Sequence, residues 1–189
     1  MSHIVFLDRD GVINKDSADY IKTPSEFEFI PKSPEAIALL CEHDFKIIII
    51  TNQSIIGRKM ADPSTLTAIF KKMTDGVKKA GGHITDIFFC PHLPKDNCSC
   101  RKPAPGLIQQ AILKHRIDLS KAIMVGDSAT DMECGLNAGC KTTVLVRTGN
   151  GNAALPALLS RNIHPDHVAD NLFAAAQWII QNIKHRNQV

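Results

Sequence analysis

The stretch FLDRDGVIN, residues 6–14, lies at the end of the first apolar run of the chain. That run, residues 3–7, is too short and too rich in β-branched side chains for a helix, so it predicts a buried strand. Asp8 and Asp10 follow at once, and Gly11 then permits a sharp turn. Ligands bind at the carboxyl ends of strands in open α/β sheets. Two carboxylates there indicate a nucleophile beside a proton-transferring acid, with a hard cation between them, although a solubilising or capping turn has the same pattern.

Polar residues also follow two later predicted strands. The strand at residues 46–50 runs into TNQS (51–54), and the strand at 122–125 runs into GDSATD (126–131). Between them, RKP (101–103) places a lysine ahead of a predicted helix. The order along the chain is therefore carboxylate pair, hydroxyl, lysine and G-D-x-x-x-D. This order resembles the haloacid dehalogenase-like superfamily of phosphohydrolases over nearly the whole sequence.

Strands and helices alternate along the rest of the chain, which predicts an α/β fold with a doubly wound, Rossmann-like parallel sheet of about five strands. Ser33 and Asp62, each followed by proline, are expected to cap helices, and residues 149–152 are expected to form a flexible turn. Residues 14–33 are too few to fold alone, and residues 54–102 offer one helix, one strand and a loop. We therefore expect a single capless domain, residues 1–189, with an open active site.

Composition excludes several classes of protein. The chain has 189 residues, and its 22 lysines and arginines exceed its 19 aspartates and glutamates by only three. With one tryptophan and one tyrosine besides, the sequence disfavours a nucleic-acid partner or a membrane surface. No apolar stretch approaches a membrane span, and the N-terminus does not read as a signal peptide. We expect a cytoplasmic monomer.

The chemistry of phosphoryl transfer assigns a role to each polar strand end. Asp8 is expected to attack phosphorus and form an aspartyl-phosphate, and Asp10 to exchange a proton with the leaving oxygen and then with water. Thr51 and Lys102 are expected to stabilise the charge on the phosphoryl oxygens. The resemblance implies that Mg²⁺ is held by Asp8, the backbone carbonyl of Asp10, and Asp127. Asp131, one helical turn further on, is expected to orient these ligands.

The most specific local pattern is CPHLPKDNCSC, residues 90–100, which carries three thiols and one imidazole. Cys₃His is a known structural zinc set, so we expect Zn²⁺ on Cys90, His92, Cys98 and Cys100. A metal-free buried or redox cluster is the alternative. The loop adjoins Arg101 and Lys102, so the zinc would fix the direction of the lysine. Cys41, Cys134 and Cys140 lie singly in apolar surroundings and are expected to pack in the core.

Together with this loop, the stretches DRDGVIN, YIKTP, TNQS and LVRTG resemble the D-glycero-D-manno-heptose 1,7-bisphosphate 7-phosphatase family. The resemblance implies removal of the 7-phosphate from a phosphorylated sugar, in the synthesis of a heptose precursor of lipopolysaccharide. It also implies a substrate pocket lined by Asp16, Tyr20, Asn52, Gln53, Ser54, Arg101 and Ser128. The guanidinium of Arg101 is a plausible partner for the second phosphate. The family usually has GIARG after TNQS, whereas this chain has IIGRK at residues 55–59, and Lys32 stands where glycine is common.

Two alternatives remain open from the sequence. The related histidinol-phosphate phosphatases share most of these stretches, including the zinc loop, and differ in substrate. An inactive member serving as a binding module is the alternative from another class, but such a protein normally lacks the nucleophile or the acid, and this chain has both. A zinc-dependent nucleic-acid binder would need a basic face with exposed aromatic side chains.

Overall fold

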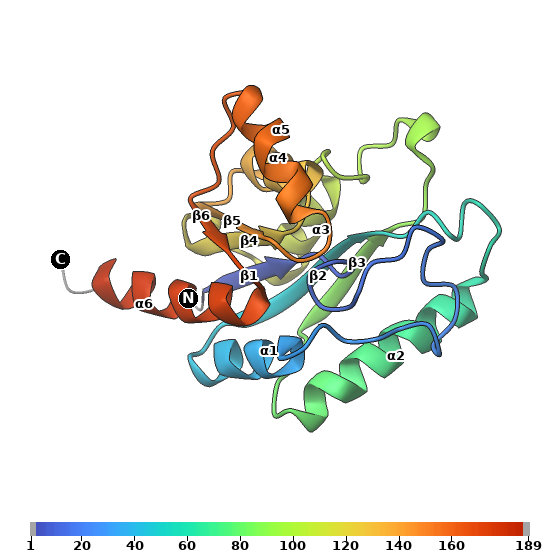
Figure 1. Cartoon of the computed structure of the whole chain (residues 1–189), viewed down its shortest axis with the longest axis horizontal. Coiled ribbons are helices and arrows are strands. Elements are labelled where there is room, and N and C mark those ends of the chain that lie inside the picture. Colours follow the sequence, from blue (N-terminus) through green and yellow to red (C-terminus); the bar gives the residue numbers. More distant parts are fainter. Residues whose placement is uncertain (1–2, 187–189) are drawn as a thin grey trace.

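The computed structural model describes residues 3–186, and its centre is a parallel sheet of six strands in the order β3-β2-β1-β4-β5-β6 (Figure 1). The strands are β1 (Ile4–Leu7), β2 (Lys46–Asn52), β3 (Asp86–Cys90), β4 (Ala122–Gly126), β5 (Thr142–Val146) and β6 (His167–Ala169). This order is that of a doubly wound α/β fold. Strands are added on one side of β1 as far as β3, and the chain then returns to add β4, β5 and β6 on the other side. The predicted fold class is confirmed.

Helices cover both faces of the sheet because its central strands are apolar on both sides. Val5 and Leu7 pack under α1 (Ser33–Glu42), α2 (Pro63–Lys79) and α6 (Leu172–Arg186). Ile4 and Phe6 point the other way, toward α3 (Gly106–His115) and α4 (Ala129–Ala138), and α5 (Gly151–Ser160) lies beside α4 on that side (Figure 1). Side chains alternate between faces along a strand, so β1 contributes to two cores.

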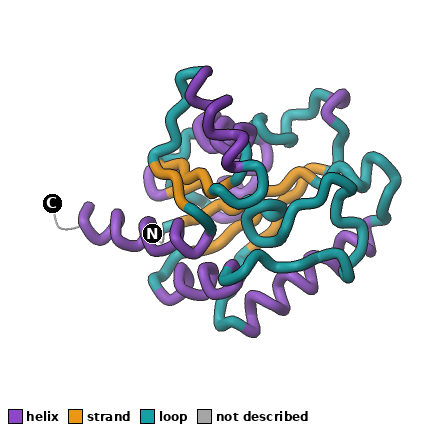
Figure 2. Tube along the Cα trace, viewed as in Figure 1, coloured by secondary structure: helices purple, strands orange, loops and turns teal. Residues whose placement is uncertain are grey.

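Loops gather at the carboxyl ends of the strands (Figure 2). The segment between β1 and α1 consists of turns with two isolated bridges, in which Asn14 pairs with Asp10 and with Phe29. Two short 3-10 helices complete the elements, η1 (Pro94–Asp96) after β3 and η2 (Leu119–Lys121) before β4. None of the helices within residues 3–186 has the length and apolar character needed to cross a membrane.

One of the two predicted helix caps is wrong. Asp62 caps α2 as expected, since its Oδ1 accepts a hydrogen bond of 2.7 Å from the backbone N–H of Thr65. Ser33 does not cap α1, because Lys32 occupies the N-cap position and the Ser33 hydroxyl donates to the carbonyl of Ile13 instead. Lys32 has φ of 66°, a left-handed conformation that glycine adopts at lower cost.

Two elements in the C-terminal part of the chain, α5 and β6, are not among those predicted from the sequence. The segment 149–152, expected to be a flexible turn, contains the start of α5 and packs against the sheet. A Cβ on Gly151 would lie 1.8 Å from the carbonyl oxygen of Val146. The glycines therefore mark close backbone approach rather than flexibility. The sixth strand, β6, has only three residues, and its polar His167 gives little periodic signal.

Candidate active site

A cleft of about 340 Å³ opens above the carboxyl ends of β1, β2 and β4. Its walls are carboxylates, hydroxyls and cationic side chains from five separate stretches of the chain: Asp8, Asp10, Asp16, Ser17, Ala18, Tyr20, Thr51, Asn52, Ser54, Arg101, Lys102, Asp127, Ser128, Thr130, Asp131 and Asn150. The parallel register brings Leu7 beside Ile49 and Val125, which places the residues after these strands at one edge.

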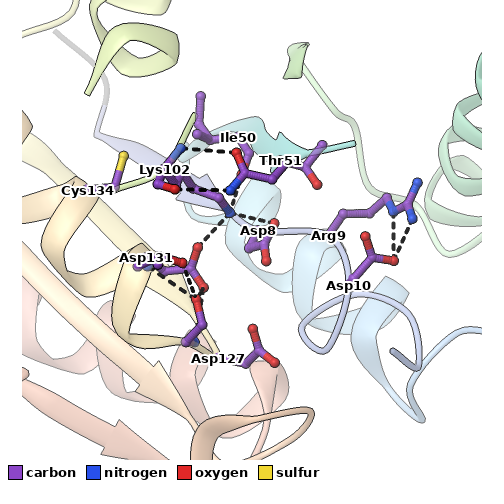
Figure 3. Close-up of polar contacts among 12 residues, drawn as sticks. Asp8, Arg9, Asp10, Ile50, Thr51, Lys102, Asp127, Asp131 and Cys134 are labelled. Carbon is purple, nitrogen blue, oxygen red and sulfur yellow. Dashed lines mark hydrogen bonds and ion pairs between the residues drawn. The ribbon is translucent and has the colours of Figure 1, made fainter. Parts of the chain in front are cut away.

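Lys102 lies between two carboxylates at the floor of this cleft (Figure 3). Its Nζ is 2.7 Å from Asp8 Oδ1 and 2.6 Å from Asp131 Oδ1, and it donates to the carbonyl of Ile50 at 2.9 Å. Burial opposes the charge of Lys102, but the carboxylates of Asp131 and Asp8 outweigh it and raise the pKa of the lysine. The lysine is thus a fixed positive charge beside Asp8.

Asp127 is held by the turn that precedes α5. Its Oδ2 accepts a hydrogen bond of 2.7 Å from the backbone N–H of Asn150. The backbones of Gly11 and Gly149 approach the same atom so closely that a Cβ on either would lie 2.1 Å from it. The hydroxyl of Thr148 donates to the carbonyl of Gly11 at 2.6 Å and joins the two loops. The position of Asp127 therefore depends on a segment distant in sequence.

Asp8, Asp127 and Asp131 form a buried acidic group whose carboxylate oxygens lie within 4.8 Å of one another. Burial raises the pKa of Asp8 to about 7, with Lys102 acting in the opposite direction. Burial, followed by the charges of Asp8 and Asp131, raises the pKa of Asp127 to about 8. Crowded oxygen ligands that resist ionisation on their own fit a hard divalent cation, which favours their charged forms.

Asp10 points away from this acidic group and toward Arg9 (Figure 3). Arg9 Nη2 lies 2.5 Å from Asp10 Oδ1, and Asn14 Nδ2 donates to the same oxygen at 2.9 Å. Gln53 Nε2 donates to Asp10 Oδ2 at 2.9 Å and to Thr51 Oγ1 at 2.8 Å. Buried side chains from the segment after β1 and from the residue after β2 thus fix the carboxylate.

The four residues of the predicted zinc loop come together at one point. Cys90, Cys98 and Cys100 have Sγ–Sγ distances of 3.3–3.6 Å, and His92 Nδ1 lies 3.5 Å from Cys90 Sγ and 3.3 Å from Cys100 Sγ. These distances are close to the edges, about 3.5–3.8 Å, of a tetrahedron with zinc bond lengths. They are far longer than a disulfide bond of about 2.05 Å. The donor set fits a tetrahedral Zn²⁺ ion bound through Nδ1 of the histidine.

The residues expected to line the substrate pocket divide into two groups. Asp16, Tyr20, Ser54, Arg101 and Ser128 line the cleft. Gln53 is buried behind Asp10 and Thr51. Asn52 reaches the cleft, but its amide is paired with Lys102, since Lys102 N–H donates to Asn52 Oδ1 at 3.1 Å and Asn52 Nδ2 donates to the Lys102 carbonyl at 3.2 Å. The amides of Asn52 and Gln53 therefore orient other site residues.

Several residues of the site were not identified from the sequence. Arg9, Asn14 and Asn150 contact the key carboxylates, and Thr130 lines the cleft. Of these residues, Arg9 alone had a signal in the sequence. It lies between two aspartates directly after a buried strand, where a charged side chain needs a partner. Asn150 gave no local signal, since its contact depends on how the segment after β5 folds back.

Comparison with known proteins gives a consistent result. The HAD-hydrolase-like family model matches residues 99–175. A D-glycero-beta-D-manno-heptose-1,7-bisphosphate 7-phosphatase from Bordetella bronchiseptica is 39% identical over 180 residues, covering 94% of this chain and 98% of that protein. The enzyme of that name from Pseudomonas aeruginosa is 41% identical over 178 residues, with coverage of 94% and 98%. The crystal structure of the B. bronchiseptica phosphatase, complexed with magnesium and phosphate, superposes with a TM-score of 0.88 at 38% identity, covering 95% of this chain and 99% of that one.

Proposed function

The chain belongs to the D-glycero-D-manno-heptose 1,7-bisphosphate 7-phosphatase family of haloacid dehalogenase-like hydrolases, and we propose that it removes the 7-phosphate from this sugar bisphosphate. The observation that carries the proposal is that Asp8, Lys102 and Asp127 lie together at the floor of one cleft, which Asp10 also lines. Such a group can accept a phosphoryl group from the substrate and then pass it to water.

We propose that Asp8 attacks phosphorus in line while the bond from phosphorus to the sugar oxygen breaks. Asp10 gives its proton to that oxygen as it leaves. Water then attacks the aspartyl-phosphate, Asp10 takes a proton from it, and the bond between phosphorus and Asp8 breaks. Thr51 and Lys102 stabilise the charge that develops on the equatorial oxygens. Because Thr51 Oγ1 already accepts from Gln53, its own proton is available for a phosphoryl oxygen.

We propose that Asp8, the Asp10 carbonyl and Asp127 hold Mg²⁺, with Asp131 orienting Lys102. When bound, the ion supplies positive charge for the transferring group and for the clustered carboxylates. The relative from B. bronchiseptica was crystallised with magnesium and phosphate, which supports this assignment. The spacing of Cys90, His92, Cys98 and Cys100 supports a structural Zn²⁺ ion. Arg101 links this loop to the cleft, since its Nη1 donates to the carbonyl of His92 at 3.2 Å.

We propose that the phosphate that does not react occupies the space beside Arg101. That residue lines both the catalytic cleft and an adjoining hollow of about 550 Å³ between the zinc loop and α4. A planar guanidinium suits two oxygens of a phosphate. The hollow is also lined by Asn97 and Thr130, whose polar groups suit sugar hydroxyls.

The test is phosphate release with Mg²⁺ from both anomers of the heptose bisphosphate and from histidinol phosphate, with Asp8→Asn as the blank. We expect the wild type to prefer a heptose bisphosphate and the variant to lose activity by about 10⁴-fold or more. Preference for histidinol phosphate would assign the protein to the related phosphatases with the same chemistry. Unchanged turnover in Asp8→Asn would contradict the nucleophile assignment.

A further inference from the structure

Among the described residues, Arg9 is the largest side chain that is less than 2% exposed, and the proposed phosphoryl transfer gives it no role. Its Nε and Nη2 contact Asp10 Oδ1 at 3.1 and 2.5 Å. The guanidinium carbon lies 6.0 Å from the ring centre of Phe70 on α2, and Nη1 has no hydrogen-bond partner within residues 3–186. A buried cation is costly unless it is paired, and within the described part of the chain Asp10 is the ion-pair partner of Arg9.

The donors around Asp10 are distributed unequally between its two oxygens. Among the described residues, 3–186, Oδ1 receives Nε and Nη2 of Arg9 and Nδ2 of Asn14, whereas Oδ2 receives only Nε2 of Gln53. A carboxylate oxygen offers about two lone pairs for hydrogen bonds. Oδ1 is therefore saturated, and Oδ2 keeps one free position.

The amide of Gln53 relates that free position to the transferring group. Its two hydrogens go to Asp10 Oδ2 and to Thr51 Oγ1, which places Oδ2 on the same side of the cleft as the phosphate-binding hydroxyl. The other oxygen faces Arg9 and the interior of the protein, where the arginine side chain is only 1% exposed.

We propose that Arg9 is a positioning residue for the acid of this enzyme: with Asn14 it holds Asp10 by Oδ1, so that Oδ2 alone faces the leaving oxygen. The inference rests on the proposed phosphatase function and goes beyond it, because it assigns a role to a residue that does not touch the substrate. Arginine suits the task because its fork contacts one oxygen through two nitrogens, whereas lysine has a single ammonium on a flexible stem. The side chain thereby fixes both the distance and the rotation of the carboxylate.

The test exploits the leaving group. A sugar alkoxide needs a proton as it departs, whereas p-nitrophenolate departs without one, and kcat/KM reports only the steps through phosphoenzyme formation. We expect Arg9→Met to lower kcat/KM for the heptose bisphosphate by about 100-fold, with a change of less than about threefold for p-nitrophenyl phosphate. Arg9→Lys is expected to fall between Arg9→Met and the wild type. In an Asp10→Asn background, Arg9→Met is expected to have no further effect on the ratio of the two substrates.

Arg161→Met is the matched control, because it removes an arginine that pairs with Glu133 on the surface. Far-ultraviolet circular dichroism and a thermal melt establish folding, and Arg9→Lys carries the test if Arg9→Met does not fold. Equal losses for both substrates, or no loss for either, would overturn the proposal, since a purely structural role lowers both together. If the wild type ignores the heptose bisphosphate but hydrolyses aryl phosphates, the proposed function fails separately. The inference is then tested with phenyl against p-nitrophenyl phosphate.

Discussion

Lys102 and Asp8 form an ion pair at the floor of the cleft, with Nζ 2.7 Å from Oδ1 and side chains that are 2% and 12% exposed. Asp131 Oδ1 lies 2.6 Å from the same ammonium, which also donates a hydrogen bond to the Ile50 carbonyl. Two carboxylates and one carbonyl therefore hold the charge of the lysine at one point relative to the strand ends.

This relationship predicts a combined loss of stability and activity in Lys102→Met. Removing the cation leaves the carboxylates of Asp8 and Asp131 buried without compensation, which costs about 3–5 kcal/mol for a buried pair of this kind. Urea unfolding measures the stability, and kcat/KM is expected to fall by at least about 100-fold. Lys114→Met, which breaks an exposed contact with Asp86, is the control and is expected to change neither by much. A fully stable Lys102→Met protein would contradict the described pairing.

Gly149→Ala is expected to weaken magnesium binding, because its Cβ would meet Asp127 Oδ2 at 2.1 Å. Gly81→Ala is the matched control, since Gly81 also has positive φ but no atom within 4 Å of the added Cβ. Both variants carry backbone strain of about 1–2 kcal/mol. Isothermal titration with Mg²⁺ separates them, and equal affinities for the two variants would show that Asp127 does not depend on this close approach.

Cys98→Ser is expected to lose bound zinc, lower the melting temperature and reduce activity together. The thiol is one of four donors at tetrahedral spacing, and the loop it closes leads directly into Arg101 and Lys102. Zinc content by atomic absorption and a thermal melt give the result. Cys41→Ser is the control and should keep its zinc, because the Cys41 thiol bonds to the backbone of His83 and lies outside the Cys/His cluster. Full zinc content and activity in Cys98→Ser would show that this thiol does not hold zinc and that the loop does not support Lys102.

Without magnesium, the stability of the protein is expected to fall as pH rises from 6.5 to 8.5. The pKa of Asp8 is raised to about 7 and that of Asp127 to about 8, largely by burial, above an unfolded value of about 3.9. The folded state therefore binds more protons than the unfolded state in this range, so the stabilisation is lost as pH passes through the folded pKa values. Melting temperatures at the two pH values, with zinc retained, test this. Asp127→Asn should flatten the slope, and Mg²⁺ should raise the melting temperature more at pH 8.5; an equal slope in Asp127→Asn would refute the assignment.

Arg101→Ala is expected to raise KM for the heptose bisphosphate by about tenfold or more, since a guanidinium contact to phosphate contributes roughly 1.5–3 kcal/mol. The kcat/KM for p-nitrophenyl phosphate, which has no second phosphate, should change little. Steady-state kinetics with the two substrates measure the difference. Arg161→Ala is the control, because Arg161 pairs with Glu133 and neither residue lines the cleft. Equal effects on both substrates would place Arg101 at the reacting phosphate instead.

The sequence predicted the elements whose signals are local. Apolar runs that end in Asp8, Thr51 and Gly126 identified three central strands, because a buried parallel strand must be apolar along its whole length. The predictions failed where a signal was short or had two possible causes. Gly149 and Gly151 predicted a flexible turn, whereas in the structure they allow two backbones to pack closely. Ser33 predicted a helix cap, whereas its hydroxyl donates to the carbonyl of Ile13.

By itself, the sequence determined the α/β class, the resemblance of its acidic and lysine stretches to a phosphatase, and the three cysteines and one histidine that gather in one loop. These depend on which residue types occur and on spacings of a few positions, and both are local properties. Only the tertiary structure decided how each side chain is used. In it, Asp10 points toward Arg9, Asn52 pairs with Lys102, and the backbone N–H of Asn150 donates to Asp127. These contacts depend on how separate segments pack at the edge of the sheet, so no local pattern of residues encodes them.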